Sequence, residues 1–205
     1  MSGQRRIVRY DFAERLTHAV AALSYTYLLL TGLAFWTPAL FWIAVVLGGG
    51  YLSRLLHPWA GLVFAASAAL MYARWRRDMR TTPADRAWRQ AMGHYVRNED
   101  SKVPPAGRFN YGQKVLFWVM FLGGMALAAS GVVMWFVAEL SAWRTLLYAA
   151  TLVHVAAALV TIGGFIVHIY MGVAVVPAGL SAIVHGEVTE EWAKTHHPLW
   201  YRERR

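Results

Sequence analysis

Four histidines lie inside otherwise apolar stretches of this 205-residue chain: His18, His57, His154 and His168. An ionisable side chain in such a stretch is costly unless it has a partner. A single histidine could serve as a helix-packing hydrogen bond. Because neutral imidazole is a good ligand for iron and other transition metals, the set of four predicts metal ligation.

The spacing of the last two histidines narrows the kind of metal site. His154 and His168 are fourteen residues apart, close to four helical turns, so they share one helix face about 21 Å apart at about 1.5 Å per residue. One metal ion cannot bridge that gap, whereas two stacked haems can each take one imidazole from this helix. The chain has no cysteine, so such haems are held noncovalently. Two axial histidines favour electron transfer, because they leave iron without an open position.

The elements that position these histidines are predicted to be membrane helices. Apolar residues make up 58% of the chain, and residues 115–138 and 145–184 contain no Asp, Glu, Lys or Arg. Apolar runs of this length are typical of transmembrane helices. We therefore expect an all-α integral membrane protein, a four-helix bundle with two haems b between the helices. Residues 1–205 are expected to form one domain, with spans at about 16–36, 51–72, 112–137 and 146–176.

The basic residues indicate the topology. The net charge is +9, and eighteen of the twenty Lys and Arg residues flank the spans on one side, leaving Arg54 and Arg144 on the other. The positive-inside rule places both termini, the loop 74–110 and the tail 180–205 in the cytoplasm. No basic face with interleaved aromatic residues is apparent, so we expect the chain to bind membrane lipid and no nucleic acid.

This topology orders the four histidines by depth. His18 and His168 fall near the cytoplasmic side, whereas His57 and His154 fall near the outer side. Depth therefore pairs His57 with His154 on an outer haem and His18 with His168 on an inner one. The remaining His94, His185, His196 and His197 are expected at the surface, with proton delivery as an alternative.

Six segments of the chain resemble the gamma subunit, cytochrome b556, of membrane-bound respiratory formate dehydrogenase, and the resemblance covers nearly the whole chain. They are Glu14–His18, Leu55–Pro58, Arg108–Lys114, Leu152–His154, Ile166–Tyr170 and Glu191–Pro198. The resemblance implies the same two haem pairs. It also implies a site for menaquinone or another quinone at Asn110, Gly112 and Gln113, beside the inner haem. From the residues alone, an alternative is that Asn110 only caps the third helix and does not contact a quinone.

The resemblance further implies the partners. These are an iron–sulfur beta subunit and a molybdenum- or tungsten-containing alpha subunit that oxidises formate outside the cytoplasmic membrane of a prokaryote. This chain would then be the quinone-reducing electron-transfer subunit of an oxidoreductase complex, with no catalytic residue of its own for formate. Its tail is short beyond Tyr201 and rich in arginine, which departs from the family pattern.

Two other functions are compatible with parts of the pattern. A membrane cytochrome b that anchors a nickel–iron hydrogenase or a molybdenum-type sulfur reductase would use the same haem ligands with a different donor. A haem-free membrane anchor or transporter would use the histidines for packing or proton transfer. The transporter is disfavoured because no Asp or Glu lies within a predicted span and no proline breaks a helix at mid-membrane.

Overall fold

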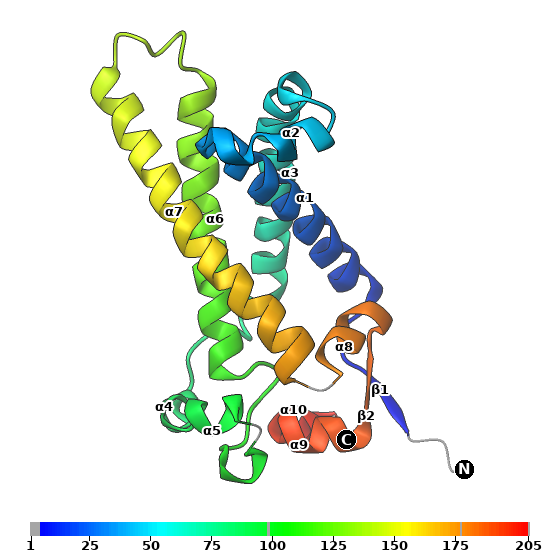
Figure 1. Ribbon diagram of the computed structural model, residues 1–205. Coiled ribbons are helices and arrows are strands. Elements are labelled where there is room, and N and C mark those ends of the chain that lie inside the picture. Colours follow the sequence, from blue (N-terminus) through cyan, green and yellow to red (C-terminus); the bar gives the residue numbers. More distant parts are fainter. Residues whose placement is uncertain (1–4, 98, 177, 205) are drawn as a thin grey trace. The chain divides into compact units, whose positions relative to one another are not determined.

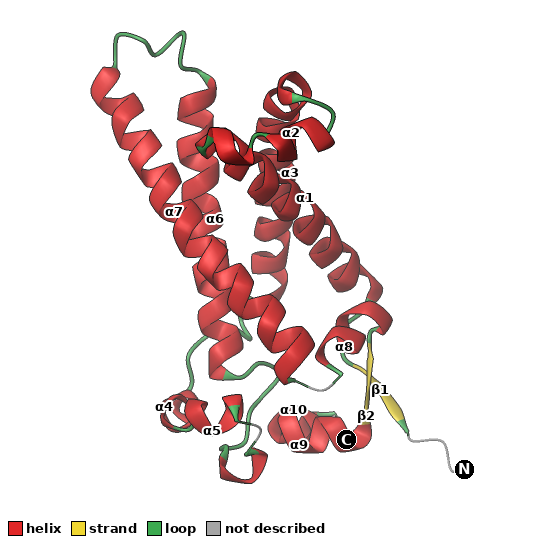
Figure 2. Cartoon of the chain, in the orientation of Figure 1, coloured by secondary structure: helices red, strands yellow, loops and turns green. Residues whose placement is uncertain are grey.

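Four long helices dominate the computed structural model, which describes residues 5–97, 99–176 and 178–204 (Figures 1 and 2). The four membrane helices expected from the sequence are therefore present. Each is long and apolar enough to cross a membrane, and a π-helical turn at Met171–Val175 (η3) continues the last one. They are α1 (Phe12–Trp36), α3 (Gly50–Trp75), α6 (Tyr111–Trp135) and α7 (Arg144–Tyr170).

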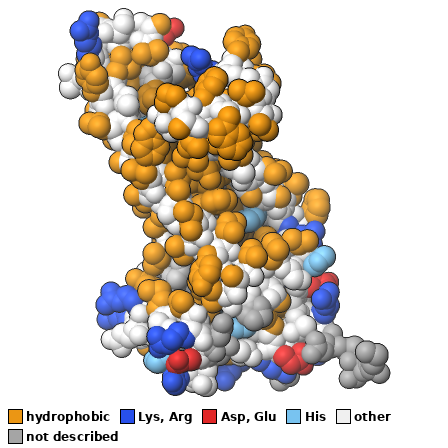
Figure 3. All heavy atoms as spheres, viewed as in Figure 1, with side chains coloured by type: hydrophobic (Ala, Val, Ile, Leu, Met, Phe, Trp, Pro, Cys, Tyr) orange, Lys and Arg blue, Asp and Glu red, His pale blue; other side chains and the backbone are white. Residues whose placement is uncertain are grey.

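The side chains of these helices suit a lipid environment. Large apolar residues such as Leu23 and Leu152 are more than 70% exposed, and hydrophobic side chains cover much of the surface visible in Figure 3. Hydroxyl side chains donate to a carbonyl oxygen one turn earlier, as Thr151 does to Leu147 at 2.9 Å. Polar groups in a bilayer need internal partners of this kind.

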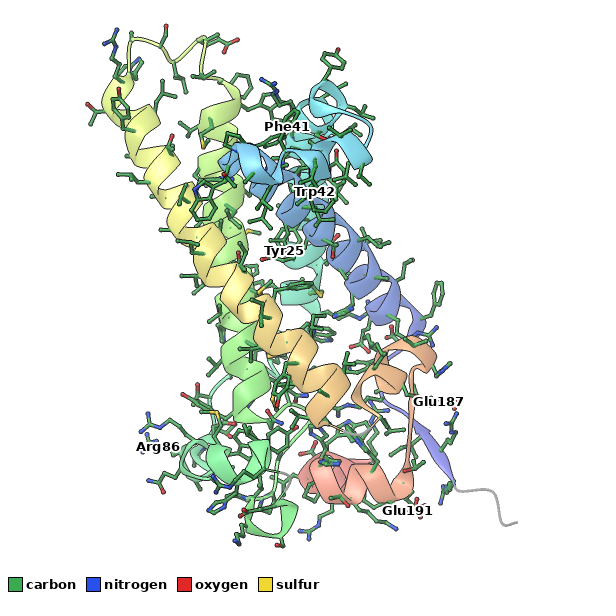
Figure 4. All side chains as sticks on the ribbon, viewed as in Figure 1. Tyr25, Phe41, Trp42, Arg86, Glu187 and Glu191 are labelled. Atoms are coloured by element: carbon green, nitrogen blue, oxygen red, sulfur yellow. The ribbon has the colours of Figure 1, made fainter. Side chains whose placement is uncertain are left out.

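The segment between α1 and α3 forms a short 3₁₀ helix (η1, Pro38–Leu40) and a short α-helix (α2, Trp42–Val46). Gly48 and Gly49 both have φ of +98°, a conformation that glycine adopts at little cost, and α3 begins directly after them. Phe41 and Trp42 are exposed on this segment, and both are labelled in Figure 4.

The remaining elements were not predicted in detail. Two short strands, β1 (Arg6–Val8) and β2 (Glu187–Thr189), pair antiparallel with Ile7 opposite Val188. The short helices are α4 (Pro83–Gln90), α5 (Met92–Val96), η2 (Asp100–Lys102), α8 (Gly179–His185), α9 (Glu190–His196) and α10 (Pro198–Glu203).

The chain divides into two compact units. The apolar unit comprises Thr17–Tyr72 and Val119–Gly163, and the polar unit comprises Met1–Leu16, Ala73–Trp118 and Gly164–Arg205. In the apolar unit Tyr25 (labelled in Figure 4) is buried and packs on Phe64, with ring centroids 5.4 Å apart. The polar unit has a core that joins the strand pair to the tail helices, made of Ala182, Val188, Ala193, Trp200 and Tyr201.

Candidate functional site

His57 lies in the second turn of α3 and contacts a hydroxyl group on α1. Its Nδ1 atom is 2.6 Å from Oγ1 of Thr31, a fully buried residue. The Thr31 hydroxyl has a single proton, which it donates to the carbonyl oxygen of Tyr27 one turn earlier, at 2.8 Å. With that proton so placed, the hydroxyl oxygen is the acceptor toward His57. We therefore assign His57 the tautomer with the proton on Nδ1, which leaves the lone pair on Nε2.

His154 on α7 has the same arrangement with a hydroxyl on α6. Its Nδ1 atom is 3.0 Å from Oγ of the buried Ser130. Ser130 donates its one proton to the carbonyl oxygen of Ala126 at 2.6 Å. By the same reasoning we assign His154 the tautomer with the proton on Nδ1, which leaves the lone pair on Nε2.

The two rings belong to the same apolar unit. Each lies beside a glycine on the hydroxyl-bearing helix. A Cβ atom placed at Gly32 would be 3.9 Å from Cε1 of His57, and one at Gly131 would be 3.4 Å from Cε1 of His154. The structure thus places two of the four predicted ligands in one unit, each with a hydroxyl and a glycine beside its ring. That both histidines ligate the same haem iron stays a prediction.

His18 and His168 are placed separately. His18 lies in the second turn of α1, in the apolar unit, and His168 lies in the last turn of α7, in the polar unit. Both side chains are half-buried. Because they belong to different units, their pairing stays a prediction.

The predicted quinone residues lie together where α6 begins. Asn110 precedes the helix, and its Oδ1 accepts from the backbone N–H of Gln113 at 2.9 Å. In return Oε1 of Gln113 accepts from the backbone N–H of Asn110 at 3.0 Å. This reciprocal pair is a capping box, so Asn110 does cap the third long helix. Its side-chain amide group remains the part suited to donate to a quinone oxygen. Gly112 lies beside the ring of Trp88, which a Cβ atom would approach to 3.6 Å.

Glu14 organises a buried ionic cluster in the polar unit that the sequence reasoning missed. Its Oε1 accepts from the indole N–H of Trp75 and from Nη2 of Arg108, both at 2.6 Å. Arg108 also donates to Asp78 at 3.0 Å. Glu14 and Arg108 were both in segments that carried the family resemblance. The one signal in the sequence that could have predicted this ion pair was that two residues of opposite charge lie in the segments that resemble the family.

His197 corrects the prediction that the tail histidines lie at the surface, because it is 1% exposed. Its Nδ1 is 2.7 Å from the carbonyl oxygen of Gly107, and its Nε2 is 3.3 Å from Nη2 of Arg9. Arg9 donates to the carbonyl oxygen of Arg108 and lies over the ring of Trp200, 4.6 Å from its centroid. The histidine therefore joins the N-terminal segment, the 107–110 turn and the tail.

This burial predicts a pH-dependent stability. Burial lowers the pKa of His197 well below its usual range, and the positive charge of Arg9 lowers it further. An unfolded chain binds a proton at this histidine below about pH 6.5, whereas the folded chain does not. Stability therefore falls as the pH drops below about 6.5, by at most about 1.4 kcal/mol per pH unit. The loss of stability can be measured by comparing heat-induced unfolding, followed by helical circular dichroism, at pH 7.5 and pH 5.5.

The matched variants are His197→Asn and His185→Asn. Asparagine can still donate to Gly107 but does not titrate, so we expect His197→Asn to be less stable than the wild type and to depend less on pH. His185 is exposed, and its replacement should leave the pH dependence unchanged. An equal pH dependence in all three proteins would contradict the assignment to His197.

Comparison with known proteins identifies the family. Residues 9–186 match the family described as prokaryotic cytochrome b561. The chain belongs to the prokaryotic cytochrome b561 family. It is also 35% identical over 204 residues to the formate dehydrogenase cytochrome b556(fdo) subunit of Escherichia coli K12. This alignment covers 99% of this chain and 95% of that protein. It is 29% identical over 205 residues to the nitrate-inducible cytochrome b556(Fdn) subunit of the same organism, covering 99% and 94%. The formate dehydrogenase cytochrome b556 subunit of Haemophilus influenzae is 33% identical, covering 99% of this chain and 85% of that protein.

Membership of this cytochrome b family implies haem b, and the apolar unit fits that group. Iron in a haem is bound by a neutral imidazole through a nitrogen lone pair. In the tautomers assigned above, Nε2 of both His57 and His154 is available, and each ring has a glycine beside it. Within the residues that the structure describes, no cluster of three or more His, Asp or Glu forms another metal site.

Proposed function

We propose that this chain is the dihaem cytochrome b subunit of a respiratory formate dehydrogenase. The observation that carries the proposal is the full-length similarity: three relatives named as cytochrome b556 subunits of formate dehydrogenase each align with 99% of this chain. The four histidines within apolar helices support it, because two haems b with two axial histidines each need four imidazole ligands.

His57 and His154 would hold the outer haem, and His18 with His168 the inner haem. When bound, each haem supplies a one-electron centre, and the two together link the outer membrane face to the inner one. The protein's own part is to present each Nε2 lone pair and to exclude water with apolar helices. Both termini lie in the cytoplasm in this proposal, since eighteen of twenty basic residues flank the spans on that side.

Quinone is reduced at the cytoplasmic side in this proposal, where Asn110, Gly112 and Gln113 lie at the start of α6. Menaquinone or another quinone takes two electrons and two protons to become quinol. Formate supplies the electrons outside the membrane on a molybdenum or tungsten subunit, and an iron–sulfur subunit passes them on. Because the protons come from the cytoplasm, the reaction builds a proton-motive force.

The haem content and the identity of the electron donor can be tested separately. We expect the chain purified in mild detergent to contain two low-spin b haems per polypeptide, by reduced-minus-oxidised spectrum and pyridine haemochrome assay. In membranes that contain the whole complex, formate should reduce these haems, and hydrogen gas should not. No haem in folded protein would overturn the cytochrome assignment, whereas reduction by hydrogen alone would favour a hydrogenase partner.

Replacing Asn110 tests the quinone site. We expect Asn110→Ala to keep both haems and to slow formate-driven quinol production at least tenfold, because the quinone oxygen loses its donor. Losing the helix cap would also cost about 1 kcal/mol of stability. Quinol formation in membrane vesicles measures the first effect and thermal stability the second.

Asn110→Ser separates the two roles of this residue. Serine caps helices about as well as asparagine, but it has no side-chain amide to reach the quinone. We therefore expect Asn110→Ser to have wild-type stability and slow quinol production. Wild-type quinol production in Asn110→Ser would show that Asn110 acts only as a cap.

A further inference from the structure

The hydroxyl groups that contact His57 and His154 are buried. Thr31 is 0% exposed and Ser130 is 5% exposed. Each has one proton, and each gives it to its own helix, to Tyr27 and Ala126 respectively. With its proton so placed, each hydroxyl presents an acceptor to the Nδ1 atom of its histidine.

The two contacts also share a local sequence pattern. Thr31 is followed by Gly32, and Trp36 comes five residues after Thr31. Ser130 is followed by Gly131, and Trp135 comes five residues after Ser130. In each case the hydroxyl contacts Nδ1 of a histidine on the next long helix, and the glycine lies beside Cε1 of the same ring. The same device thus occurs twice, once on α1 and once on α6.

We propose that Thr31 and Ser130 are positioning residues that hold His57 and His154 in the tautomer and ring orientation that ligate the outer haem. The inference rests on the proposed haem pairing. Partners of this kind fix the ring of a metal-bound histidine and increase its basicity. A more basic imidazole stabilises oxidised iron over reduced iron, so these two hydroxyls lower the potential of the outer haem.

Two pairs of variants test the proposal in the purified chain. Thr31→Val keeps the shape of the side chain but removes the hydroxyl acceptor, whereas Thr31→Ser retains a hydroxyl. On α6, Ser130→Ala removes the hydroxyl acceptor and Ser130→Thr retains it. We expect Thr31→Val and Ser130→Ala to shift one of the two haems to a higher potential, to move its low-spin EPR signal and to retain that haem about 10- to 100-fold less tightly. The second haem should not change, and Thr31→Ser and Ser130→Thr should behave as the wild type.

The apolar unit supplies matched controls. Thr161 is also 0% exposed, and its hydroxyl donates to the carbonyl oxygen of Ala158. Ser67 is 5% exposed, and its hydroxyl donates to the carbonyl oxygen of Val63. Thr161→Val and Ser67→Ala therefore remove equally buried hydroxyls, and we expect both haem potentials to remain at their wild-type values.

The outcomes separate this inference from the proposed function. A wild-type chain without two b haems would overturn the proposed function itself. A dihaem wild type in which Thr31→Val and Ser130→Ala keep the wild-type potentials and EPR signals would overturn only the positioning role. A shift of the same size in Thr161→Val or Ser67→Ala would overturn it as well, because a general loss of packing would then explain the effect.

Discussion

Replacing His57 with alanine is expected to remove one of the two haems from the purified chain and to stop formate from reducing the other. Alanine offers no ligand, and an iron left with one axial imidazole loses its six-coordinate, low-spin state and half of its bonds to the protein. His154→Ala should have the same effect, because both rings lie in the apolar unit and would ligate the same iron. Haem per polypeptide, by pyridine haemochrome assay, should fall to half in each variant.

The double variant His57→Ala, His154→Ala makes this prediction specific to the pairing. If both histidines bind one haem, the double variant should retain as much haem as either single variant. If they serve different haems, it should retain almost none, and the pairing would be wrong. His185→Ala is the control, since this exposed histidine lies outside the four spans and its loss should leave haem content unchanged.

The second large effect is expected from a buried ion pair in the polar unit. Nζ of Lys114 is 2.8 Å from Oδ2 of Asp85, and both side chains are less than 10% exposed. The same carboxylate oxygen accepts from the backbone N–H of Thr82 at 2.5 Å. Lys114→Met would leave this carboxylate buried without its cation, at a cost of about 3–5 kcal/mol in the free energy of unfolding. Heat-induced loss of helical circular dichroism measures the difference.

Two further variants show whether the charge is the cause. Lys114→Met combined with Asp85→Asn removes both charges and keeps a side-chain acceptor for Thr82, so we expect most of the lost stability to return. Lys194→Met breaks a surface pair in which the lysine is 48% exposed, and it should cost less than about 1 kcal/mol. A double variant as unstable as Lys114→Met alone would contradict the electrostatic explanation.

The Asp85 pair also predicts how stability changes in acid. Burial favours the neutral form of Asp85, but hydrogen bonds from Lys114 and Thr82 outweigh it and lower its pKa below the usual value. The stability from this group is therefore complete above the usual aspartate pKa of about 3.9 and is lost as the pH falls further. The His197 effect occurs at higher pH, so the two are separable in a stability profile from pH 8 to pH 3.

The four membrane helices could be predicted from the sequence because a bilayer imposes a simple rule. Within about 30 Å of hydrocarbon, charges are excluded and backbone groups must bond within the helix. Residues 115–138 and 145–184, without a single Asp, Glu, Lys or Arg, satisfy that rule visibly. The candidate ligands stood out for the same reason, since a histidine in such a segment needs a partner.

The contacts of those histidines were not predictable, because they depend on which helix faces are neighbours. Thr31 and His57 are 26 residues apart, and Ser130 and His154 are 24 residues apart. A threonine or serine in an apolar helix looks the same in sequence whether it bonds only its own backbone, as Ser67 does, or also accepts from a ring. Only packing of the helices distinguishes the two cases.

The polar unit shows even more clearly the difference between what the sequence predicts and what tertiary contacts decide. Alone, the sequence determined that the segments around Glu14, Arg108 and His197 lie outside the predicted spans, because their charged and polar residues exclude them from the hydrocarbon. The tertiary structure decided that Glu14 bonds Arg108 and that His197 is buried between Gly107 and Arg9. These partners are 90 or more residues apart along the chain. Local propensity therefore carries no information about them, and only the folded chain brings their charges and hydrogen-bonding groups into contact.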